Sequence, residues 1–360
     1  MAPINTRALA ELEEIHAQNE LIVVYSIARR RRRRQRRVWV RQVFLDRAVD
    51  GDFHNLLVKL RLGDAAMFLN FMRMSPQQFD FLENLVRPLI EVRSTHLRSA
   101  ISSAERLAIT LRFLATGNSF QSPSYSFRVG KSTISQLVPK QGFSINLMAS
   151  CDASYKFTSV YIGYYGRESD GGVFAASQLG IFVDNGHKNL PAPFALPNGG
   201  PVLPYVFVAD DAFPLKTNLM KPYPGTQAAN SAKRIYNYRL SRARRCVENA
   251  FGVMCARWRV LRNRMSLLPD NAVLVVAACC CLHNFLMQEG RQVGGYCPPQ
   301  FADTTGSSGE LISGDWRNST PPLPQAYRQG SNTYSRRAAD VRDSFASYFH
   351  GPGAVPWQFT

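Results

Sequence analysis

The residue best placed to do chemistry is Glu248, the one acid in a basic stretch with helical spacing. The stretch LSRARRCVENAFG covers residues 240–252, and Arg242, Arg244 and Arg245 precede the glutamate. A carboxylate can ligate a divalent metal ion, and guanidinium groups around it can bind phosphates. The alternative is a surface helix in which Glu248 forms an ion pair with Arg244 or Arg245. The spacing favours the metal-binding interpretation.

The apolar residues of this stretch recur at helical spacing, which indicates where its charges point. The residues expected to share one face are Leu240, Ala243, Val247 and Phe251. Most of the arginines would then lie on the opposite face, and Ser241 would be the N-cap. Glu248 borders the apolar face, so we expect its carboxylate to point inward.

A second acid, Asp210, follows a short apolar run. Residues 205–208, YVFV, predict a strand that ends at Ala209-Asp210-Asp211. Ligand sites in open α/β sheets form at the carboxyl ends of strands. The 38 positions from Asp210 to Glu248 suit a loop and a long helix. Taken by itself, Asp210 would be interpreted as a turn cap at the strand end. The presence of the Glu248 helix favours a metal site instead.

The stretch LSRARRCVENAFG, followed by RWRVL, closely resembles the last catalytic helix of PIF/Harbinger transposases and of the nucleases derived from them. The resemblance extends from about Val38 to Leu286. It implies a DDE nuclease with a ribonuclease H-like core that cleaves DNA phosphodiester bonds with Mg²⁺ or Mn²⁺. Glu248 matches the family's third catalytic carboxylate in V-E-x-x-F-G. VADDAFPL resembles the second catalytic motif and places its Asp at Asp210.

The first catalytic Asp of that family has no counterpart here. The family carries it on the first strand of the sheet, inside an Asp-Gly-x-His motif. In this chain only residues 139–142 separate the helix predicted to end near Val138 from the strand predicted to start at Phe143. No Asp or Glu occurs between Glu105 and Asp152. The chain therefore resembles an internally shortened form, for which we expect weak cleavage or none.

Two other acids could approach the ions in place of the missing one. Asp152 lies between two predicted strands. Asp170 lies in GRESDGGVF, which resembles the family's G-S-x-x-D-x-x-x-F stretch with Arg167 in place of the usual Ser. The spacing does not choose between them.

The overall charge favours a polyanionic partner. The 360 residues include 43 Lys and Arg against 26 Asp and Glu, a net charge of +17. Nucleic acid is the first candidate and an acidic membrane surface the second. No apolar run is expected to reach the roughly 18 residues of a membrane span. The seven cysteines, three of them consecutive at 279–281, suggest buried thiols in a reducing compartment.

The densest charge lies near the N-terminus. Residues 29–47 carry a net charge of +9, after a predicted helix over residues 8–28. The run predicts a nuclear import signal, a phosphate-binding arm, or both, and the alternative is a solvated charge run. We expect a nuclear protein, with the cytoplasm as a second location. The arginines of the run are Arg29, Arg30, Arg31, Arg32, Arg33, Arg34, Arg36 and Arg37.

Helices are predicted over much of residues 51–140. Ser75 and Pro76 begin one helix, and Gly117 ends another. A short helix after Gly130 follows a turn, which suits either a helix-turn-helix that contacts DNA through Lys131 or an ordinary bundle cap. The run VGKST lacks the first glycine of a P-loop, so we expect no nucleotide cofactor.

The fold class expected is α/β, with a helical N-terminal region and an incomplete ribonuclease H-like mixed sheet with flanking helices. A hairpin is expected around Asp152 and one helix over residues 173–182. Residues 272–287 predict a helix that is apolar all round and therefore buried on every side. The C-terminal helix, from Ser335 to His350, would dock on the core or bind a partner. The expected regions are 1–50 for the helix and basic arm, 51–140 for the helical region, 141–289 for the nuclease core, 290–334 for a flexible linker and 335–360 for the C-terminal helix and tail.

Two functional classes therefore remain. One is a transposase-derived nuclease that acts on DNA, for which the resemblance also implies a separate Myb-like DNA-binding partner. The other is a non-catalytic DNA- or protein-binding module that keeps the basic surface and has lost the ions.

Overall fold

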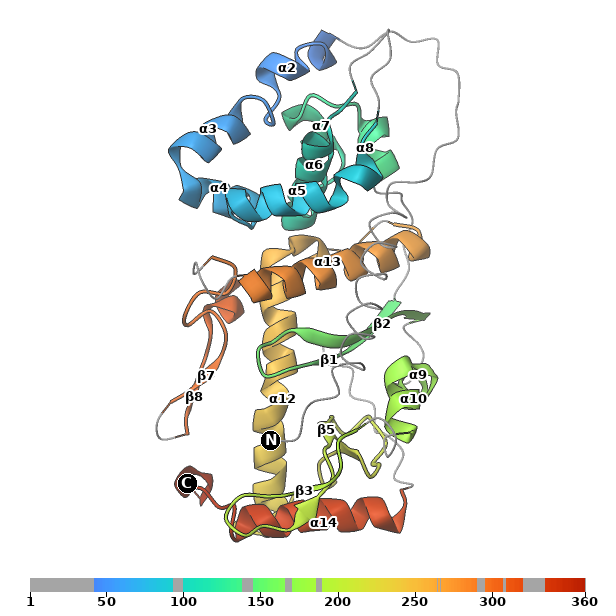
Figure 1. The fold of residues 1–360 in the computed structure, drawn as a ribbon, viewed down its shortest axis with the longest axis vertical. Coiled ribbons are helices and arrows are strands. Elements are labelled where there is room, and N and C mark those ends of the chain that lie inside the picture. The colour runs from blue at the N-terminus through green and yellow to red at the C-terminus, as the bar shows by residue number, and fades with distance from the viewer. Residues whose placement is uncertain are drawn as a thin grey trace. The chain divides into compact units, whose positions relative to one another are not determined.

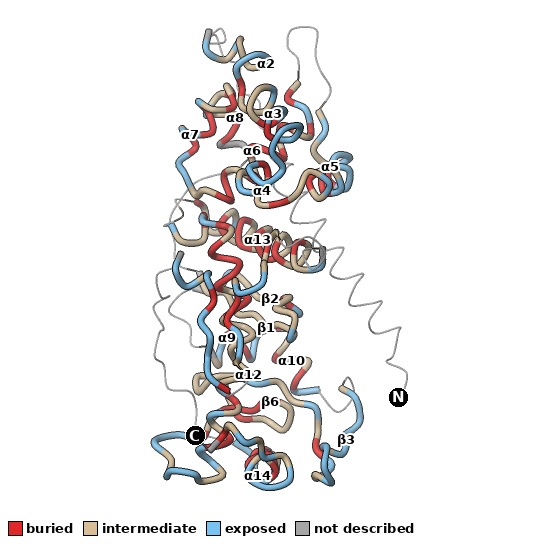
Figure 2. The backbone as a smooth tube through the Cα atoms, turned by 90° about the vertical axis from the view of Figure 1, so that its left-hand side faces the viewer, coloured by how far each residue is buried: buried red, intermediate tan, exposed pale blue. Residues whose placement is uncertain are grey.

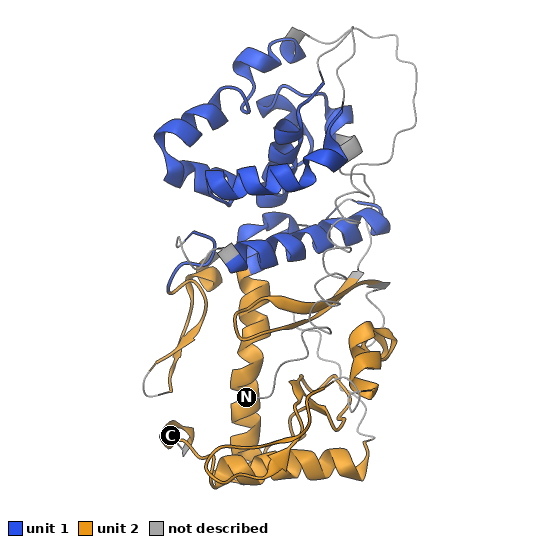
Figure 3. Cartoon of the chain, viewed as in Figure 1, with its two compact units in different colours: residues 1–145, 254–299 blue, residues 146–253, 300–360 orange. Residues whose placement is uncertain are grey.

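The computed structural model describes two compact units, coloured in Figure 3. One comprises residues 1–145 and 254–299, and the other comprises residues 146–253 and 300–360. The residues described are 42–92, 100–137, 145–165, 170–185, 190–263, 265, 267–289, 295–306, 309–319 and 334–359. The predicted helix over residues 8–28 and the arginine run lie outside them.

The regular secondary structure described in the first unit is almost entirely helical (Figure 1). Its elements are η1 (Gln42–Phe44), α2 (Arg47–Asp50), α3 (Leu56–Gly63), α4 (Ala65–Met72), α5 (Pro76–Ile90), α6 (Ser103–Thr116), α7 (Gln121–Ser126), α8 (Lys131–Leu137), η2 (Arg259–Arg262) and α13 (Pro269–Glu289).

Local capping signals account for several of these boundaries. Ser75 and Gln78 form a reciprocal capping box with Pro76 at the first helical position of α5, which confirms that predicted start. Gly117 ends α6 with φ 64°, as predicted. A Cβ there would lie 3.0 Å from the carbonyl oxygen of Arg259, so this glycine also permits close packing against η2. The short helix α4 was not predicted; the Asp64 side chain caps it by accepting from the amide of Met67.

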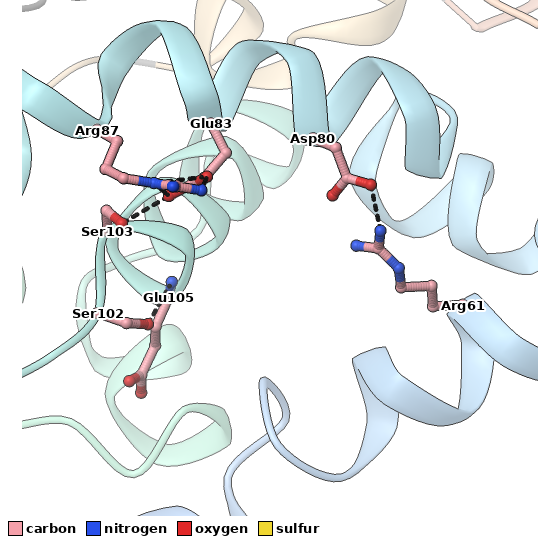
Figure 4. A network of polar contacts seen from close by, with 7 residues as sticks. All are labelled: Arg61, Asp80, Glu83, Arg87, Ser102, Ser103 and Glu105. Atoms are coloured by element: carbon pink, nitrogen blue, oxygen red, sulfur yellow. Dashed lines mark hydrogen bonds and ion pairs between the residues drawn. The ribbon is translucent and has the colours of Figure 1, made fainter.

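A polar network joins α5 to α6 (Figure 4). The buried carboxylate of Glu83 accepts hydrogen bonds from Arg87 and from the hydroxyl of Ser103. The bond from Arg87 is the main reason that the pKa of Glu83 lies below its ordinary value. Ser102 is the N-cap of α6, since its hydroxyl accepts from the amide of Glu105, and the neighbouring Ser103 donates to Glu83.

Helix α13 buries one face rather than its whole circumference. The buried residues are Ala272, Val275, Val276, Cys279, Cys280, His283 and Leu286. They recur every three or four positions, and the other described side chains of the helix are half-buried or exposed. The expectation of a helix buried all round is therefore wrong. By length and composition α13 could cross a membrane, contrary to the expectation that no run would reach that length. Core helices satisfy the same criterion, and 44% of its apolar window is buried.

The second unit combines helices with short strands. Its elements are β1 (Ile145–Cys151), β2 (Phe157–Tyr165), α9 (Asp170–Ala176), α10 (Gln178–Asp184), β3 (Phe194–Ala195), β4 (Val202–Leu203), β5 (Phe207–Val208), β6 (Leu219–Met220), α12 (Ala232–Arg257), β7 (Thr304–Thr305), β8 (Leu311–Ile312), η3 (Asp315–Ser319), α14 (Arg336–His350) and η4 (Pro356–Phe359). The last residues of α12 belong to the first unit.

The chain is confirmed as a mixed α/β protein that is mostly helical, but the strands do not form one large sheet. In the described ranges they pair two by two, as β1–β2, β3–β4, β5–β6 and β7–β8. The β1–β2 hairpin, with its turn at residues 152–156, confirms the prediction for that segment. Within the residues that the structure describes, the strands do not join into the single mixed sheet of a ribonuclease H-like core.

Two helix predictions need correction. The helix expected over residues 173–182 is divided at Ser177, whose hydroxyl caps α10 and donates to the carbonyl oxygen of Phe174. Helix α12 begins at Ala232, not after Ser241, because the Ser231 hydroxyl accepts from the amide of Arg234.

The core of the second unit includes the C-terminal helix. Phe345 and Ala346 of α14 pack in one cluster with Tyr236 and Leu240 of α12. Of the two alternatives expected for this helix, docking on the core is the one observed. The buried segments of α12 and α14 are red in Figure 2.

Candidate metal centre

The site begins at the only parallel strand pair of the described residues, β5 with β6. Phe207 of β5 packs against an apolar cluster that contains Phe174, Val183 and Leu219, which fixes the strand in place. The amide of Ala209 donates to the carbonyl oxygen of Met220 at 2.9 Å, so pairing continues to the residue before Asp210. Parallel strands end at the same edge of a sheet. The residues that follow β5 and β6 therefore meet there.

Asp210 is half-buried and forms the tip of a turn. Its Oδ1 accepts from the amide of Ala212 at 2.9 Å, and its Oδ2 lies 3.8 Å from the guanidinium of Arg244 on α12. The turn cap that was the alternative for this residue is thus present. One carboxylate oxygen still faces α12, so the cap does not exclude a role as a ligand.

The neighbouring Asp211 is neutralised by a buried lysine. Lys221, which is 1% exposed, places its ammonium 3.2 Å from Asp211 Oδ1 and donates to the Asp211 carbonyl oxygen at 3.0 Å. Sequence reasoning assigned no role to Lys221. Its position directly after β6, at the edge where Asp210 and Asp211 follow β5, could have indicated it. This pair leaves Asp210 as the acid that faces α12.

Glu248 lies on α12 one turn after Arg244, about 6 Å further along the helix axis. It is half-buried, and it makes no ion pair within 4 Å with any residue that the structure describes. The expected alternative, a pair with Arg244 or Arg245, is not observed. The pKa of the Arg317 guanidinium is raised, mainly by its hydrogen bond with Asp303. The negative charge of Glu248 adds to this increase. Asp210 and Glu248 therefore border one face of α12, with the Arg244 guanidinium beside Asp210.

The residue after Glu248 ties a distant segment to α12. Asn249 is buried; its amide donates to the carbonyl oxygen of Asp303 at 3.0 Å and its Oδ1 accepts from the Asp303 amide at 2.9 Å. The indole of Trp316 donates to the same Oδ1 at 3.0 Å. The carboxylate of Asp303, also buried, pairs with Arg317. Residues 300–306 and 309–319 thus fold onto α12 in a segment whose composition predicts a linker.

The structure separates the two candidate replacement acids. Asp152 is committed to the hairpin turn, where its Oδ1 accepts from the amides of Ser154 and Lys156. Its charge reinforces the effect of burial in raising the pKa of Cys246, two residues before Glu248. Helix positions i and i+2 do not share a face. Asp152 therefore lies toward a different side of α12 from Glu248.

The backbone at Asp170 lies beside the Asp210 turn. Asp170 is the first residue of α9, and a Cβ on Gly171 would lie 3.6 Å from the carbonyl oxygen of Ala212. The rings of Phe174 and Phe213 meet edge to face at 5.7 Å and hold α9 against this turn. Backbone placement thus favours Asp170 over Asp152 as a neighbour of Asp210.

The basic residues predicted to bind nucleic acid have varied surroundings. Arg242 donates to the carbonyl oxygen of Gly309 and lies 3.9 Å from the Trp357 ring centroid, so it holds the C-terminal segment. Arg245 acts on Asp303 and helps to lower its pKa. Lys131 is exposed at the start of α8, and the arginines of residues 29–37 lie outside the described residues.

The carboxylates whose side chains the structure describes do not complete a two-ion site. No group of three or more Asp, Glu, His or Cys side chains that could hold a metal ion occurs in the described parts of the chain. The guanidinium of Arg244 contributes positive charge beside Asp210, where a divalent ion would need further oxygen ligands. The residues present therefore fit only part of a metal site.

Comparison with known proteins shows what part of this chain is similar to. The family described as DDE superfamily endonuclease matches residues 131–284, a range that contains Asp152, Asp170, Asp210 and Glu248. Residues 131–284 are thus similar to that family, whose nucleases typically use divalent metals.

Two curated proteins are similar to the chain. "Protein ALP1-like" of Arabidopsis thaliana is 28% identical over 150 residues, which cover 41% of this chain and 36% of that protein. "Putative nuclease HARBI1" of Homo sapiens is 26% identical over 156 residues, which cover 42% of this chain and 39% of that protein. The chain is thus a distant homologue of Harbinger-derived proteins, and each match spans less than two fifths of the relative. No solved structure matches the chain.

Proposed function

We propose that the chain is a transposase-derived protein of the nuclease family whose divalent-metal-dependent cleavage of DNA phosphodiester bonds is weak or lost. The ancestral ligands of Mg²⁺ or Mn²⁺ in this proposal are Asp210 and Glu248. The family match over residues 131–284 supports the ancestry. The lost activity is supported by the structure of the site.

The observation that carries the proposal is the contact between Arg244 and Asp210. Phosphodiester cleavage by two metal ions requires several carboxylates to bridge and position the ions. Here a guanidinium lies 3.8 Å from the Asp210 carboxylate, and the described residues hold no cluster of three ligands. An ion misplaced by about 1 Å can already reduce a rate by about a hundredfold. The partial site should therefore bind an ion weakly and position it poorly.

Asp170 is the acid most able to compensate. The packing of α9 against the Asp210 turn brings its backbone next to this site, whereas Asp152 caps a hairpin. Residual activity, if measured, is therefore expected to depend on Asp170 rather than on Asp152.

A second function, that of a non-catalytic DNA- or protein-binding module in the nucleus, is favoured by the same contact. An Asp210 already paired with Arg244 is stable without metal, and the net charge of +17 still attracts DNA. In this alternative a Myb-like partner would supply sequence preference, and the basic arm at residues 29–37 would supply nuclear import and non-specific affinity.

The two functions are separated by titrating Mg²⁺ and Mn²⁺ in a plasmid-nicking assay beside a DNA-binding assay with the full chain. Weak nicking that Glu248→Gln abolishes and Glu310→Gln leaves unchanged supports residual catalysis. Glu310 is exposed in the same unit and provides a matched change of charge. DNA binding without nicking at any metal concentration favours the binding module. Robust nicking by the unaltered chain would contradict the proposed loss of activity.

A further inference from the structure

A cluster of arginines surrounds a small pocket in the first unit, separate from the carboxylates of the second. The pocket has a volume of about 130 Å³. The residues that line it are Ala66, Leu69, Asn70, Arg73, Arg257 and Gly295. None of them is acidic, and two are arginines whose side chains reach it from different elements.

Arg73 is held at the wall of this pocket in an unusual conformation. It is the C-cap of α4 with φ 65°, a left-handed conformation that glycine or asparagine adopts more readily than arginine. One terminal nitrogen donates to Asn70 Oδ1 at 2.6 Å. Its Nε is buried and has no hydrogen-bond partner among the described residues. An arginine with a costly backbone and a buried unsatisfied donor is a poor choice for stability alone.

The positive charges of four other guanidinium groups affect the pKa of Arg73. Burial first, and then the charges of Arg259, Arg257, Arg112 and Arg262, lower its pKa to about 10. At neutral pH the group is therefore still charged, and it makes no ion pair with a carboxylate in the described part of the chain. Like charges held this close raise the energy of the free protein, and a bound anion would lower it.

Hydrogen bonds to backbone carbonyl oxygens hold two arginine side chains of the cluster in place. Arg257 donates to the carbonyl oxygens of Tyr296 and Gly295 at 2.7 and 3.2 Å. Arg112 donates to the carbonyl oxygen of Phe71 at 3.1 Å and stacks on the Phe71 ring. The negative charge of Asp52 partly offsets the lowering of the pKa of Arg112. No described acid has such an effect on the pKa of Arg73. The guanidinium groups are thus preorganised, which reduces the entropy lost when an anion binds.

We propose that this pocket binds a phosphate group through Arg73 and Arg257, with Asn70 and the surrounding arginines in support. A phosphate presents several acceptor oxygens and up to two negative charges, which suits convergent guanidinium donors better than a single carboxylate does. The phosphate can come from the backbone of a nucleic acid or from a free phosphate ion. Because the pocket lies in the first unit, the proposal does not depend on the chemistry of Asp210 and Glu248.

The proposal is tested with Arg73→Gly in the full chain and with Arg128→Gly as a matched control. Arg128 also has a positive φ, of 53°, and loses the same charge, but it pairs with Asp50 and is not part of the cluster. Thermal unfolding is followed with inorganic phosphate against chloride at equal ionic strength. We expect phosphate to stabilise the unaltered chain and Arg128→Gly. Arg73→Gly should bind phosphate at least about tenfold more weakly, the loss of a charge-assisted hydrogen bond.

Glycine suits the left-handed backbone, so Arg73→Gly should fold. Arg259→Gln, an exposed member of the cluster, provides a second variant that should weaken phosphate binding several-fold. Binding of a labelled DNA duplex then identifies the source. A tenfold loss for Arg73→Gly alone assigns the site to the nucleic-acid backbone, and unchanged DNA affinity with lost phosphate binding assigns it to the free ion. No phosphate effect on the unaltered chain, or equal losses in Arg73→Gly and Arg128→Gly, would overturn the proposal.

Discussion

Asp303→Asn should destabilise the second unit strongly at neutral pH. Asp303 and Asn249 attach residues 300–306 and 309–319 to α12 next to Glu248, so the substitution tests what holds the candidate site together. The Asp303 side chain is 1% exposed and accepts from Arg317 Nε at 2.9 Å and from the Gly314 amide at 2.8 Å. An asparagine of the same shape loses the charge and presents NH₂ to one of these donors.

The expected cost follows from the burial of the two partners. Removing one member of a buried ion pair typically costs about 3–5 kcal/mol. Arg317 is 39% exposed and can regain water, so we expect about 2–3 kcal/mol here. For a unit of this size that corresponds to a fall in Tm of at least about 5 °C. Asp315→Asn makes the same change at an exposed position of the segment and is the control, with no shift beyond about 1 °C.

The effect should depend on pH in one direction. Burial opposes ionisation of Asp303, but the bonds from Arg317 and Gly314 outweigh it and hold its pKa below the ordinary 3.8. The carboxylate therefore stabilises the fold fully above pH 3.8, and this contribution disappears as pH falls through the lowered pKa. The Tm difference between Asp303→Asn and the unaltered chain should be largest near pH 7 and shrink below about pH 4. A difference of less than about 1 °C at pH 7, or one that grows in acid, would refute the reasoning.

Three further predictions concern other parts of the chain. Replacing the eight arginines of residues 29–37 with glutamine should move a tagged chain to the cytoplasm and flatten the salt dependence of DNA binding; unchanged localisation and slope would contradict it. Tyr223→Phe removes the hydroxyl that donates to Asp343 at 2.5 Å and should cost about 1 kcal/mol in urea unfolding, with faster proteolysis of the C-terminal helix. Arg244→Gln should increase the rise in Tm that Mn²⁺ produces and Asp210→Asn should abolish it, whereas equal shifts in both variants would exclude a metal at Asp210.

Elements specified by nearby residues were predictable. The start of α5 follows from Ser75, Pro76 and Gln78, and the end of α6 from Gly117. The β1–β2 hairpin follows from alternating residues on either side of a turn. In each case the determining residues lie within one turn of the boundary, so the sequence pattern contains the relevant interactions.

Interactions between distant residues were not predictable. Residues 300–319 are rich in Gly, Ser and Thr and indicate a linker, but the bonds between Asp303 and Asn249 join positions 54 residues apart. Likewise, no local pattern shows that the Lys221 ammonium neutralises Asp211. Helix α12 starts earlier than expected because the burial of Ile235 and Tyr236 in tertiary contacts adds to the cap at Ser231 and overrides the predicted cap at Ser241.

For the candidate site, the motifs identified Asp210 and Glu248 but not their surroundings. Whether they ligate a metal remains a prediction. The strand edge places Asp210 toward α12, and its contact with Arg244 was not predicted, because both residues were assigned to ligand binding. The side chain that opposes a carboxylate depends on packing, which spacing in the sequence does not describe.

The most direct test of the account is a nicking assay on the chain with a strand bearing Asp-Gly-x-His inserted between Val138 and Phe143. The account attributes weak or absent cleavage to the loss of one ion-bridging carboxylate together with its strand. It therefore predicts little or no Mg²⁺-dependent nicking by the unaltered chain, and nicking by the inserted chain that Glu248→Gln abolishes. Robust nicking by the unaltered chain that Glu248→Gln abolishes would contradict the account.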